Sequence, residues 1–589
     1  MKMNEHLALD GLKTKMDAAK PLTISERSRR GMYSDLSARG EPFLWGFGGA
    51  LALGMMMVIG FLVLIVANGL TTFYPKPIMV VTLKDGSKVA GEPTRTELYK
   101  LPAGYPLEKS TGEGGKESDI PPGFARRTLY RTGNFDLYNE DFKWVSHDDV
   151  VSKEAPEDIY LFERLEWGPF IGFIRSMDLD GERIPFTDEA SGRLAESLRQ
   201  ATDRLGRIKR LEREEIGAVN HEMDGERLAL KRVALDKGEN SEAYRQAMER
   251  FAEQTKRLQG QYDLLMDEAR SVKAEDARYT LTLADVRGRE KVLPLSQIVR
   301  YLAPNDLSLP QKLGVFFSRW GEFLTAEPRE ANTEGGVMPA IFGTFVMTVL
   351  MALAVAPFGI MAALYLREYA KQGRLVSIMR ICVNNLAGVP SIVYGVFGLG
   401  FFAYICGGAI DRIFFPERLP NPTFGTGGVL WSALTLALLT VPVVIVATEE
   451  ALAAVPQSMR EGSLACGASK WQTIRYIVLP RAMPGIMTGL ILAMARGAGE
   501  VAPLMLVGVV KLAPELPIDH VFPYIHLERS FMHLGFHIFD VGFQSRNSEA
   551  GKPMVFVTTF LLITLVGIMN ATAIYVRNRL KKKFIAGHF

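Results

Sequence analysis

The chain has 589 residues, of which 48% are hydrophobic and 23% charged, with a formal net charge of +3 and three cysteines. So small a net charge excludes the global field that draws a protein to nucleic acid. Cys382, Cys406 and Cys466 lack the spacing of a metal site or of a disulfide framework. The averages conceal two kinds of segment, because charge gathers in 75–335 whereas 337–576 is mostly apolar.

Six apolar stretches are long enough to cross a membrane, since a helical span needs about 20 mostly apolar residues. The first, 43–70, contains no charged residue and is too long for a cleaved signal peptide. We therefore expect a mainly α membrane protein with six transmembrane helices, at 43–70, 337–365, 381–407, 428–447, 485–510 and 553–576.

Lysine and arginine gather in alternate connections between these stretches. The N-terminal segment 1–42, the connections after the second and fourth spans, and the tail 577–589 are all basic. Because positive loops stay in the cytoplasm, both termini are expected there. The long connection 71–335 then lies outside, where large domains are translocated largely regardless of their charge. Residues 336–576 form the remaining five-helix core.

The connection 71–335 is expected to fold as an extracytoplasmic α/β insert that carries a helical hairpin. Residues 78–92 place an Asp-Gly pair between β-prone runs, which predicts a β-hairpin, and 279–299 repeat the theme. Between them, about 187–277 show a helical apolar spacing that breaks before Asn240, the expected N-cap of the second helix. The hairpin is either a structural element or a docking surface for another subunit or a binding protein.

Two further patterns were considered as ligand sites. Residues 114–116 lack the upstream glycine and the following Ser or Thr of a phosphate-binding loop, so no nucleotide site is expected in this chain. Three histidines have a spacing that a metal could use, but no acidic or cysteine partner completes a site in the sequence, and no metal is expected at His526, His533 and His537.

The connection 448–484, between the fourth and fifth spans, is too structured for a simple link. Its centre reads EGSLACGASKWQTIRYIVLP and resembles the coupling loop of ABC importer permeases, which docks on an ATPase subunit. The residues that match this pattern are Glu461, Gly467, Ile477, Leu479 and Pro480. Glycine and serine replace the usual alanines at positions 462 and 463.

The coupling loop has a physical rationale as a pair of short helices. Gly467 permits a sharp turn between them, and Pro480 is expected to end the second helix. An apolar face suited to burial against a partner is expected from Trp471, Ile474, Ile477 and Val478. An amphipathic helix pair that lies on the membrane is the alternative.

Four other segments resemble the PstA-type permease of the phosphate-specific ABC importer. They include LAGVPSIVYG at 386–395 and ARGAGEVAPLMLVG at 495–508, together with glycine- and tyrosine-containing motifs at 334–344 and 357–369. The last segment has Gly and Val where the family has Ala and Thr. The resemblance covers the first span and about 330–589, and it implies the type I ABC importer permease fold and the transport of inorganic phosphate across the bacterial inner membrane.

The same resemblance implies which partners the chain has. They would be a second homologous permease of the PstC type, a PstB-type ATPase dimer that holds ATP and Mg²⁺, a PstS-type phosphate-binding protein outside, and membrane lipid. The chain would then be a transporter subunit that binds no cofactor and is not itself an enzyme. A homodimeric pore stays open from the sequence alone.

Arg496 and Glu500 are candidate residues of the substrate pathway, because ionisable groups inside a span are costly and usually functional. Spaced four apart, they are expected to share one face of the fifth-span helix. Arg496 would attract a phosphate anion and Glu500 would hold the arginine in place; a structural ion pair is the alternative. Close helix packing in the third span is expected from Gly388, Pro390, Ser391 and Gly395.

Two other functions remain open at this stage. The same machine could carry another oxyanion, such as sulfate, molybdate or phosphonate. A membrane-anchored receptor is the second alternative, and it predicts one or two spans with a cytoplasmic output domain. An enzyme is the least favoured class, since the sequence offers no nucleophile–base pair and no metal cluster.

Overall fold

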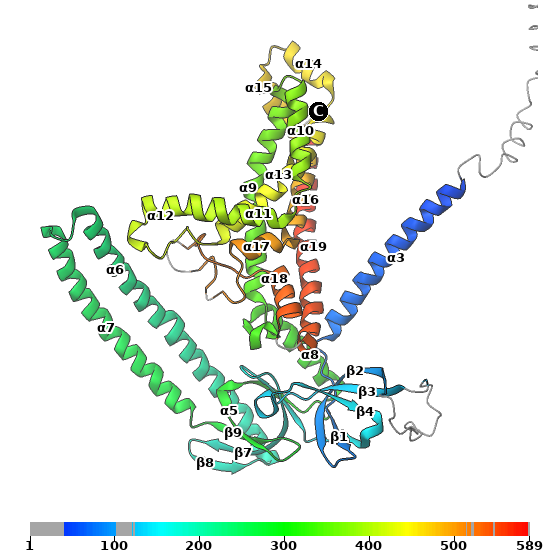
Figure 1. The fold of residues 1–589 in the computed structure, drawn as a ribbon, viewed down its shortest axis with the longest axis vertical. Helices are drawn as coiled ribbons and strands as arrows, with labels where there is room; N and C mark the ends of the chain where they lie inside the picture. The colour runs from blue at the N-terminus through cyan, green and yellow to red at the C-terminus, as the bar shows by residue number, and fades with distance from the viewer. Residues whose placement is uncertain are drawn as a thin grey trace, which may run out of the picture. The chain divides into compact units, whose positions relative to one another are not determined.

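The computed structural model describes residues 41–101, 121, 124–513, 515–519, 524–545 and 548–586. Helix α3 (Glu41–Thr71) begins in a first unit that ends at Ala67, and everything from Asn68 onward belongs to a second unit (Figure 1). The basic residues expected before the first span, and the 114–116 pattern, lie outside the described residues.

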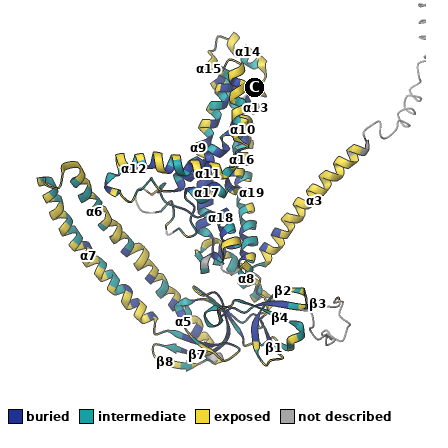
Figure 2. Cartoon of the chain, viewed as in Figure 1, coloured by how far each residue is buried: buried dark blue, intermediate teal, exposed yellow. Residues whose placement is uncertain are grey.

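Among the described residues, six helical segments are long and apolar enough to cross a membrane, which confirms the predicted number. They run over Trp45–Thr71, Met338–Tyr369, Ser391–Phe414, Val429–Ala453, Lys470–Gly499 and Ser548–Lys582. A receptor with one or two spans is inconsistent with this count. Helix α3 is exposed along most of its length (Figure 2), as a helix surrounded by lipid would be.

The expected start of the third span, residue 381, is wrong. Residues before it form a separate helix, α10 (Arg374–Leu386), and the span begins only at α11 (Ser391–Phe397), continuing through η6 (Gly398–Gly407) and α12 (Gly408–Phe414). Pro390 explains the break, because a proline has no N–H to donate and disfavours helical backbone in the residue before it.

The remaining spans pack around α13 (Val429–Ala453). It lies against α9 (Met338–Leu364) and against α16 (Leu479–Gly499), and the second span ends in η5 (Tyr365–Tyr369). A Cβ added at Gly359 would come within 2.6 Å of Val444, and one at Gly485 within 2.5 Å of Ala451. Glycines at these crossings let the helix backbones approach closely, as is common in membrane interfaces.

The described part of the insert contains two larger antiparallel sheets. The first has the order β4-β3-β2-β1-β5 and the second the order β10-β9-β7-β6-β11, with β8 paired to β7. The strands are β1 (Met79–Leu83), β2 (Lys88–Lys100), β3 (Phe124–Arg131), β4 (Phe142–Ser146), β5 (Val150–Glu154), β6 (Tyr160–Arg164), β7 (Phe170–Leu179), β8 (Glu182–Pro185), β9 (Thr280–Ala284), β10 (Glu290–Pro294) and β11 (Ile298–Leu302). Gly86 and Gly288, both with φ of 82°, make the turns of β1–β2 and β9–β10.

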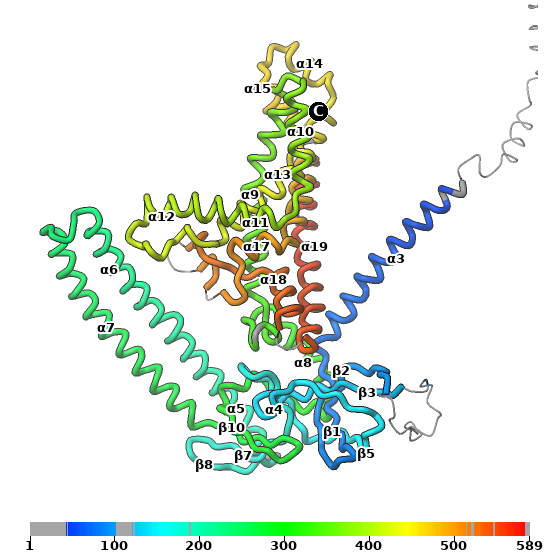
Figure 3. The backbone as a smooth tube through the Cα atoms, in the orientation of Figure 1, coloured from blue at the N-terminus to red at the C-terminus, as the bar shows by residue number. Residues whose placement is uncertain are grey.

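The helical part of the insert lies between β8 and β9. It consists of α5 (Asp188–Lys209), η2 (Arg210–Glu215), α6 (Ile216–Lys237) and α7 (Glu242–Asp276), and α6 packs along α7 (Figure 3). The N-cap of α7 is Ser241, whose hydroxyl accepts from the Tyr244 N–H at 3.1 Å, so the expectation of Asn240 is wrong by one residue. Helix α6 reaches the turn η7 (Pro416–Arg418), where Arg232 pairs with Glu417 at 2.6 Å.

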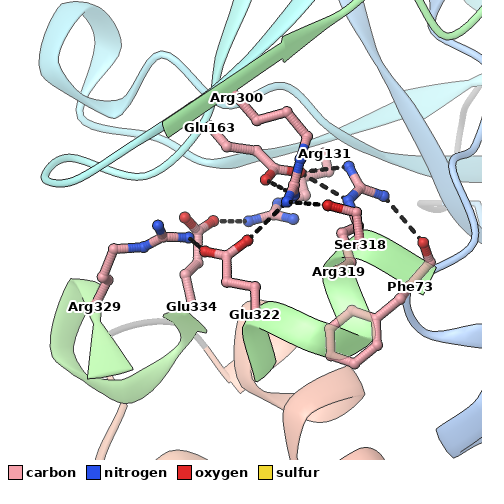
Figure 4. Close-up of polar contacts among 9 residues, drawn as sticks. All are labelled: Phe73, Arg131, Glu163, Arg300, Ser318, Arg319, Glu322, Arg329 and Glu334. Carbon is pink, nitrogen blue, oxygen red and sulfur yellow. Dashed lines mark hydrogen bonds and ion pairs between the residues drawn. The ribbon is translucent and has the colours of Figure 1, made fainter. Parts of the chain in front are cut away.

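A network of largely buried ion pairs joins the second sheet to the helix and the ribbon that precede the second span (Figure 4). Glu163 of β6 accepts from Arg300 of β11 and from Arg319 of α8 (Leu309–Thr325), each at 2.6 Å. Glu322 of α8 pairs with Arg300 at 3.0 Å and with Arg329 at 2.7 Å. Burial alone would raise the pKa of the Glu163 carboxyl, but Arg319 and Arg300 hold it below its usual value.

A second ion pair extends this network to the segment that leads into α9. Arg131 of β3 contacts Glu334 at 2.6 Å, and Glu334 belongs to the two-stranded ribbon β12 (Pro328–Arg329) and β13 (Glu334–Gly335). Burial raises the pKa of Glu334 despite its arginine partner. The network therefore joins the strands to α8 and to the ribbon that leads directly into the second span.

Replacing Glu163 by glutamine should destabilise the protein by about 3 kcal/mol, because removing one partner of a buried ion pair leaves the other charges uncompensated. The apparent Tm of the purified protein measures this. The matched control is Glu97→Gln, which breaks the more exposed pair of Glu97 with Arg127 on β2 and β3 and should cost at most about 1 kcal/mol. Equal shifts in Tm for the two variants would contradict a structural role for the network.

Candidate functional site

Arg496 lies in the last turn of α16, which ends at Gly499. Glu500 follows the helix in extended conformation, with φ of −80° and ψ of 131°, so the expectation that both residues lie within the span on one helix face is wrong. The two side chains still approach one another, with Arg496 Nε 3.6 Å from Glu500 Oε1. They remain 40% and 22% exposed, respectively.

The end of α16 brings together two segments that the sequence analysis singled out, 386–395 and 495–508. The short helix α17 (Ala502–Val507) packs against α11, and a Cβ added at Gly395 would lie 2.7 Å from the Cα of Pro503. On the other side of the turn before α11, the Tyr394 hydroxyl donates to the Leu386 carbonyl at 2.6 Å. Arg496 therefore lies near two broken helices, and irregular backbone in a membrane is tolerated where it is buried in protein or lines a water-filled cavity.

The predicted packing residues of the third span lie partly in a helix contact and partly in the turn before α11. Gly395 is buried against α17, whereas Gly388 and Pro390 are exposed in the turn before α11, and Ser391 is the first residue of that helix. Within this chain, the expectation of close packing at Gly388 and Pro390 is therefore wrong. Both residues instead shape the turn, as glycine and proline commonly do.

The geometry at Arg496 suits a transient anion better than a permanent ion pair. A separation of 3.6 Å between Arg496 Nε and Glu500 Oε1 is too long for a charge-assisted hydrogen bond. A guanidinium presents a planar fork of donors that matches phosphate or carboxylate oxygens. An anion bound there would compete with Glu500, whose negative charge would limit how tightly it is held.

The predicted coupling loop forms α14 (Gln457–Ala465) and α15 (Lys470–Thr473), joined by a turn at Gly467. Gly467 has φ of 84°, a conformation that side chains with a Cβ rarely adopt, and no atom would lie within 4 Å of an added Cβ. A glycine is therefore required at position 467 by the backbone conformation and not by a lack of room for a side chain. Glu461 and Gly467 are both exposed, and Figure 1 shows the two short helices at the opposite end of α9 from α8.

Polar contacts hold this loop against the end of the second span. Arg460 pairs with Glu368 of η5 at 3.0 Å and also donates to the Leu452 carbonyl at 2.7 Å. Lys470 Nζ lies 5.0 Å from the ring centre of Tyr369, a cation–π contact. The contact of Arg460 with Glu368 was not predicted from the sequence. The one signal for it was that Glu368 and Tyr369 belong to the 357–369 motif.

Two expectations about the loop are wrong. Pro480 does not end a helix; it follows the π-helical turn η8 (Ile474–Val478), inside a helical segment that runs from Lys470 to Gly499. Ile474 and Val478 are buried within the chain itself and do not form a surface for a partner, whereas Ile477 is only partly buried. The exposed apolar side chains here are Leu464, Trp471 and Tyr476.

The three histidines of the connection between the fifth and sixth spans have separate environments. His526 contacts Asp519 at 3.1 Å and Glu528 at 3.3 Å. His533 and His537 are buried, and burial lowers the pKa of each to about 4, which leaves them neutral at pH 7. Within the described residues, no group of three or more His, Cys, Asp or Glu side chains is arranged to hold a metal.

Comparison with known proteins adds independent information about residues 355–582, which match the family described as "Binding-protein-dependent transport system inner membrane component". The probable ABC transporter permease protein YqgI of Bacillus subtilis is 30% identical over 264 residues, which are 43% of this chain and 84% of the relative. The probable phosphate transport system permease protein PstA of Methanocaldococcus jannaschii is 31% identical over 39% of this chain and 72% of its own length.

The phosphate transport system permease protein PstA 1 of Mycobacterium tuberculosis is 42% identical over 175 residues, and the match spans about half of its length, 51%, and 30% of this chain. Among solved structures, the inward-facing MetNI methionine ABC transporter aligns with 41% of this chain and 94% of its own, at 17% identity and a TM-score of 0.31. That structural likeness is too weak to carry an argument.

Proposed function

Because the chain belongs to the family of inner membrane components of binding-protein-dependent transport systems, and is thus the permease subunit of an ABC importer, we propose that its cargo is inorganic phosphate. The observation that carries the proposal is the half-exposed Arg496 at the meeting point of 386–395 and 495–508. Relatives described as phosphate transport permeases support the same cargo.

In the proposed mechanism, a phosphate-binding protein of the PstS type delivers phosphate on the side of the insert. The anion enters a pathway shared with a second permease of the PstC type and is attracted by the Arg496 guanidinium, which offers paired donors to its oxygens. The Glu500 carboxylate pairs with the Arg496 guanidinium again when phosphate leaves. Binding is thereby kept weak enough for release, which a transport pathway requires.

The energy would come from a PstB-type ATPase dimer that binds ATP and Mg²⁺ and contacts α14 and α15. Their exposed surface offers Glu461 and apolar side chains, and the contacts of Arg460 and Lys470 would pass a displacement of the loop to the second span. In this arrangement the loop and both termini are cytoplasmic, the insert is extracytoplasmic, and the chain resides in the bacterial inner membrane.

Uptake of radiolabelled phosphate tests the cargo, in a bacterial strain that lacks its own phosphate importer and expresses this chain with its neighbouring subunits. Uptake should exceed that of the empty strain and should be suppressed by unlabelled phosphate but not by an equal excess of sulfate. Equal suppression by sulfate, molybdate or phosphonate would assign the chain to one of those oxyanions instead.

A further inference from the structure

Helix α8 (Leu309–Thr325) is amphipathic, but its polar side faces the protein. Arg319 and Glu322 join the buried ion pairs, and Ser318 accepts from Arg300 at 3.1 Å (Figure 4). On the other side of the helix, Leu313, Phe317 and Leu324 are 44%, 67% and 39% exposed. Spaced four and seven apart, they line one helix face.

This orientation is the reverse of that of a helix on a water-facing domain, which turns its apolar side inward. The outward stripe of α8 contains no charged side chain; between its apolar residues stand Gly314 and Gly321. The ion pairs of Arg319 and Glu322 fix the rotation of the helix, so the apolar stripe cannot turn inward. An apolar medium outside the chain is therefore needed to cover it.

The position of α8 identifies that medium. The Trp320 ring lies 6.1 Å from Phe560, inside the sixth span, and 5.2 Å from Phe73, two residues beyond the end of the first span. Next to Trp320, at the same end of α8, the Val337 N–H donates to the Phe323 carbonyl at 2.8 Å and fixes the helix to the start of α9. Helix α8 thus lies directly beside the sixth span, which is long and apolar enough to cross a membrane.

We propose that α8 is an interfacial helix that inserts Leu313, Phe317 and Leu324 into the leaflet on the side of the insert. Such helices lie in the plane of the membrane with their apolar face at the boundary between headgroups and acyl chains. Tryptophan and other aromatic side chains favour the same depth. On the charged side of α8, Arg319 contacts Glu163 of β6 and so connects the helix to the sheets. The insert would then be held at a defined height above the bilayer.

Collision-sensitive spin labelling tests this proposal in the full chain, purified with its subunits and reconstituted into lipid vesicles. After Cys382, Cys406 and Cys466 are replaced by alanine, single cysteines are introduced as Phe317→Cys and Leu324→Cys. The matched control is Leu264→Cys in α7, where an apolar helical side chain is 73% exposed and far along the chain from any span. Molecular oxygen concentrates in lipid, whereas a charged nickel chelate stays in water.

Labels at positions 317 and 324 should collide more with oxygen than with the nickel chelate, and the label at 264 should show the reverse. A water-like ratio at 317 and 324 would overturn the proposal. Low accessibility to both reagents would also overturn it, because a protein partner would then cover the stripe. The Tm of each variant is compared with that of the cysteine-free protein, and an unchanged Tm shows that the variant folds. If Phe317→Cys does not fold, Leu313→Cys reports on the same stripe.

Discussion

Replacing Arg496 by glutamine should lower phosphate uptake by roughly 10- to 100-fold, since hydrogen bonds to charged groups are worth about 1.5–3 kcal/mol. Glutamine keeps polarity and much of the length but lacks the positive charge and the paired donors of a guanidinium. Initial rates of labelled phosphate uptake measure the effect, normalised to the amount of assembled complex in the membrane. Unchanged uptake would remove Arg496 from the pathway.

The matched control is Glu500→Gln, which breaks the same 3.6 Å ion pair from its other side. If Arg496 serves the anion, the glutamate variant should retain uptake and have a lower KM, because nothing then competes with phosphate for the guanidinium. If the pair is purely structural, the two variants should impair assembly and transport to the same extent. The comparison therefore separates the two interpretations that the sequence left open.

Replacing Gly467 by valine should release the ATPase from the detergent-purified complex and abolish ATP-driven uptake. Valine at φ of 84° is a genuine outlier, and forcing a left-handed backbone costs about 1–2 kcal/mol per residue. We expect the backbone at position 467 to leave the left-handed conformation, so that the turn opens. This would displace α14 from α15 and alter the surface that the two helices present together. Co-purification of the ATPase subunit, measured as its ratio to this chain, gives the readout.

Gly462→Ala is the matched control for this experiment. Gly462 lies within α14, nothing lies within 4 Å of an added Cβ, and alanine favours a helix more than glycine does. This variant should keep the ATPase and full uptake, and Gly467→Asn should fall between the two, because asparagine tolerates left-handed backbone. Full ATPase binding by Gly467→Val would show that coupling does not depend on this turn.

The spans were predictable because a bilayer imposes a length that few soluble helices satisfy. The start of the third span was not, since apolar residues continue across the turn at Pro390 and composition alone does not reveal a break. The six strands between Phe124 and Pro185 were missed for a different reason. Two of them pair with strands more than 100 residues away, β6 with β11 and β7 with β9, and a bulge between Ile174 and Ser176 interrupts the alternation.

At the candidate site, the sequence identified Arg496 and Glu500 but not the end of the helix between them. Pro503 disfavours continuation of α16 past Gly499, because its ring would crowd the carbonyl of residue 499 and it has no N–H to donate to that carbonyl. This signal was present in the sequence. The anchoring of Arg460 to Glu368 was not, because charged pairs 92 residues apart leave no local pattern.

The contacts at the two ends of the second span have a mechanical consequence. One end is fixed to the coupling loop by Glu368 and Tyr369, and the other to α8 and the insert by Val337 and Glu334. The helical segment between them, Met338–Tyr369, has 32 residues and is about 48 Å long at 1.5 Å per residue. The second span therefore connects the α14–α15 loop directly to α8 and the insert, and a tilt of the loop would be transmitted along this one helical segment to the insert.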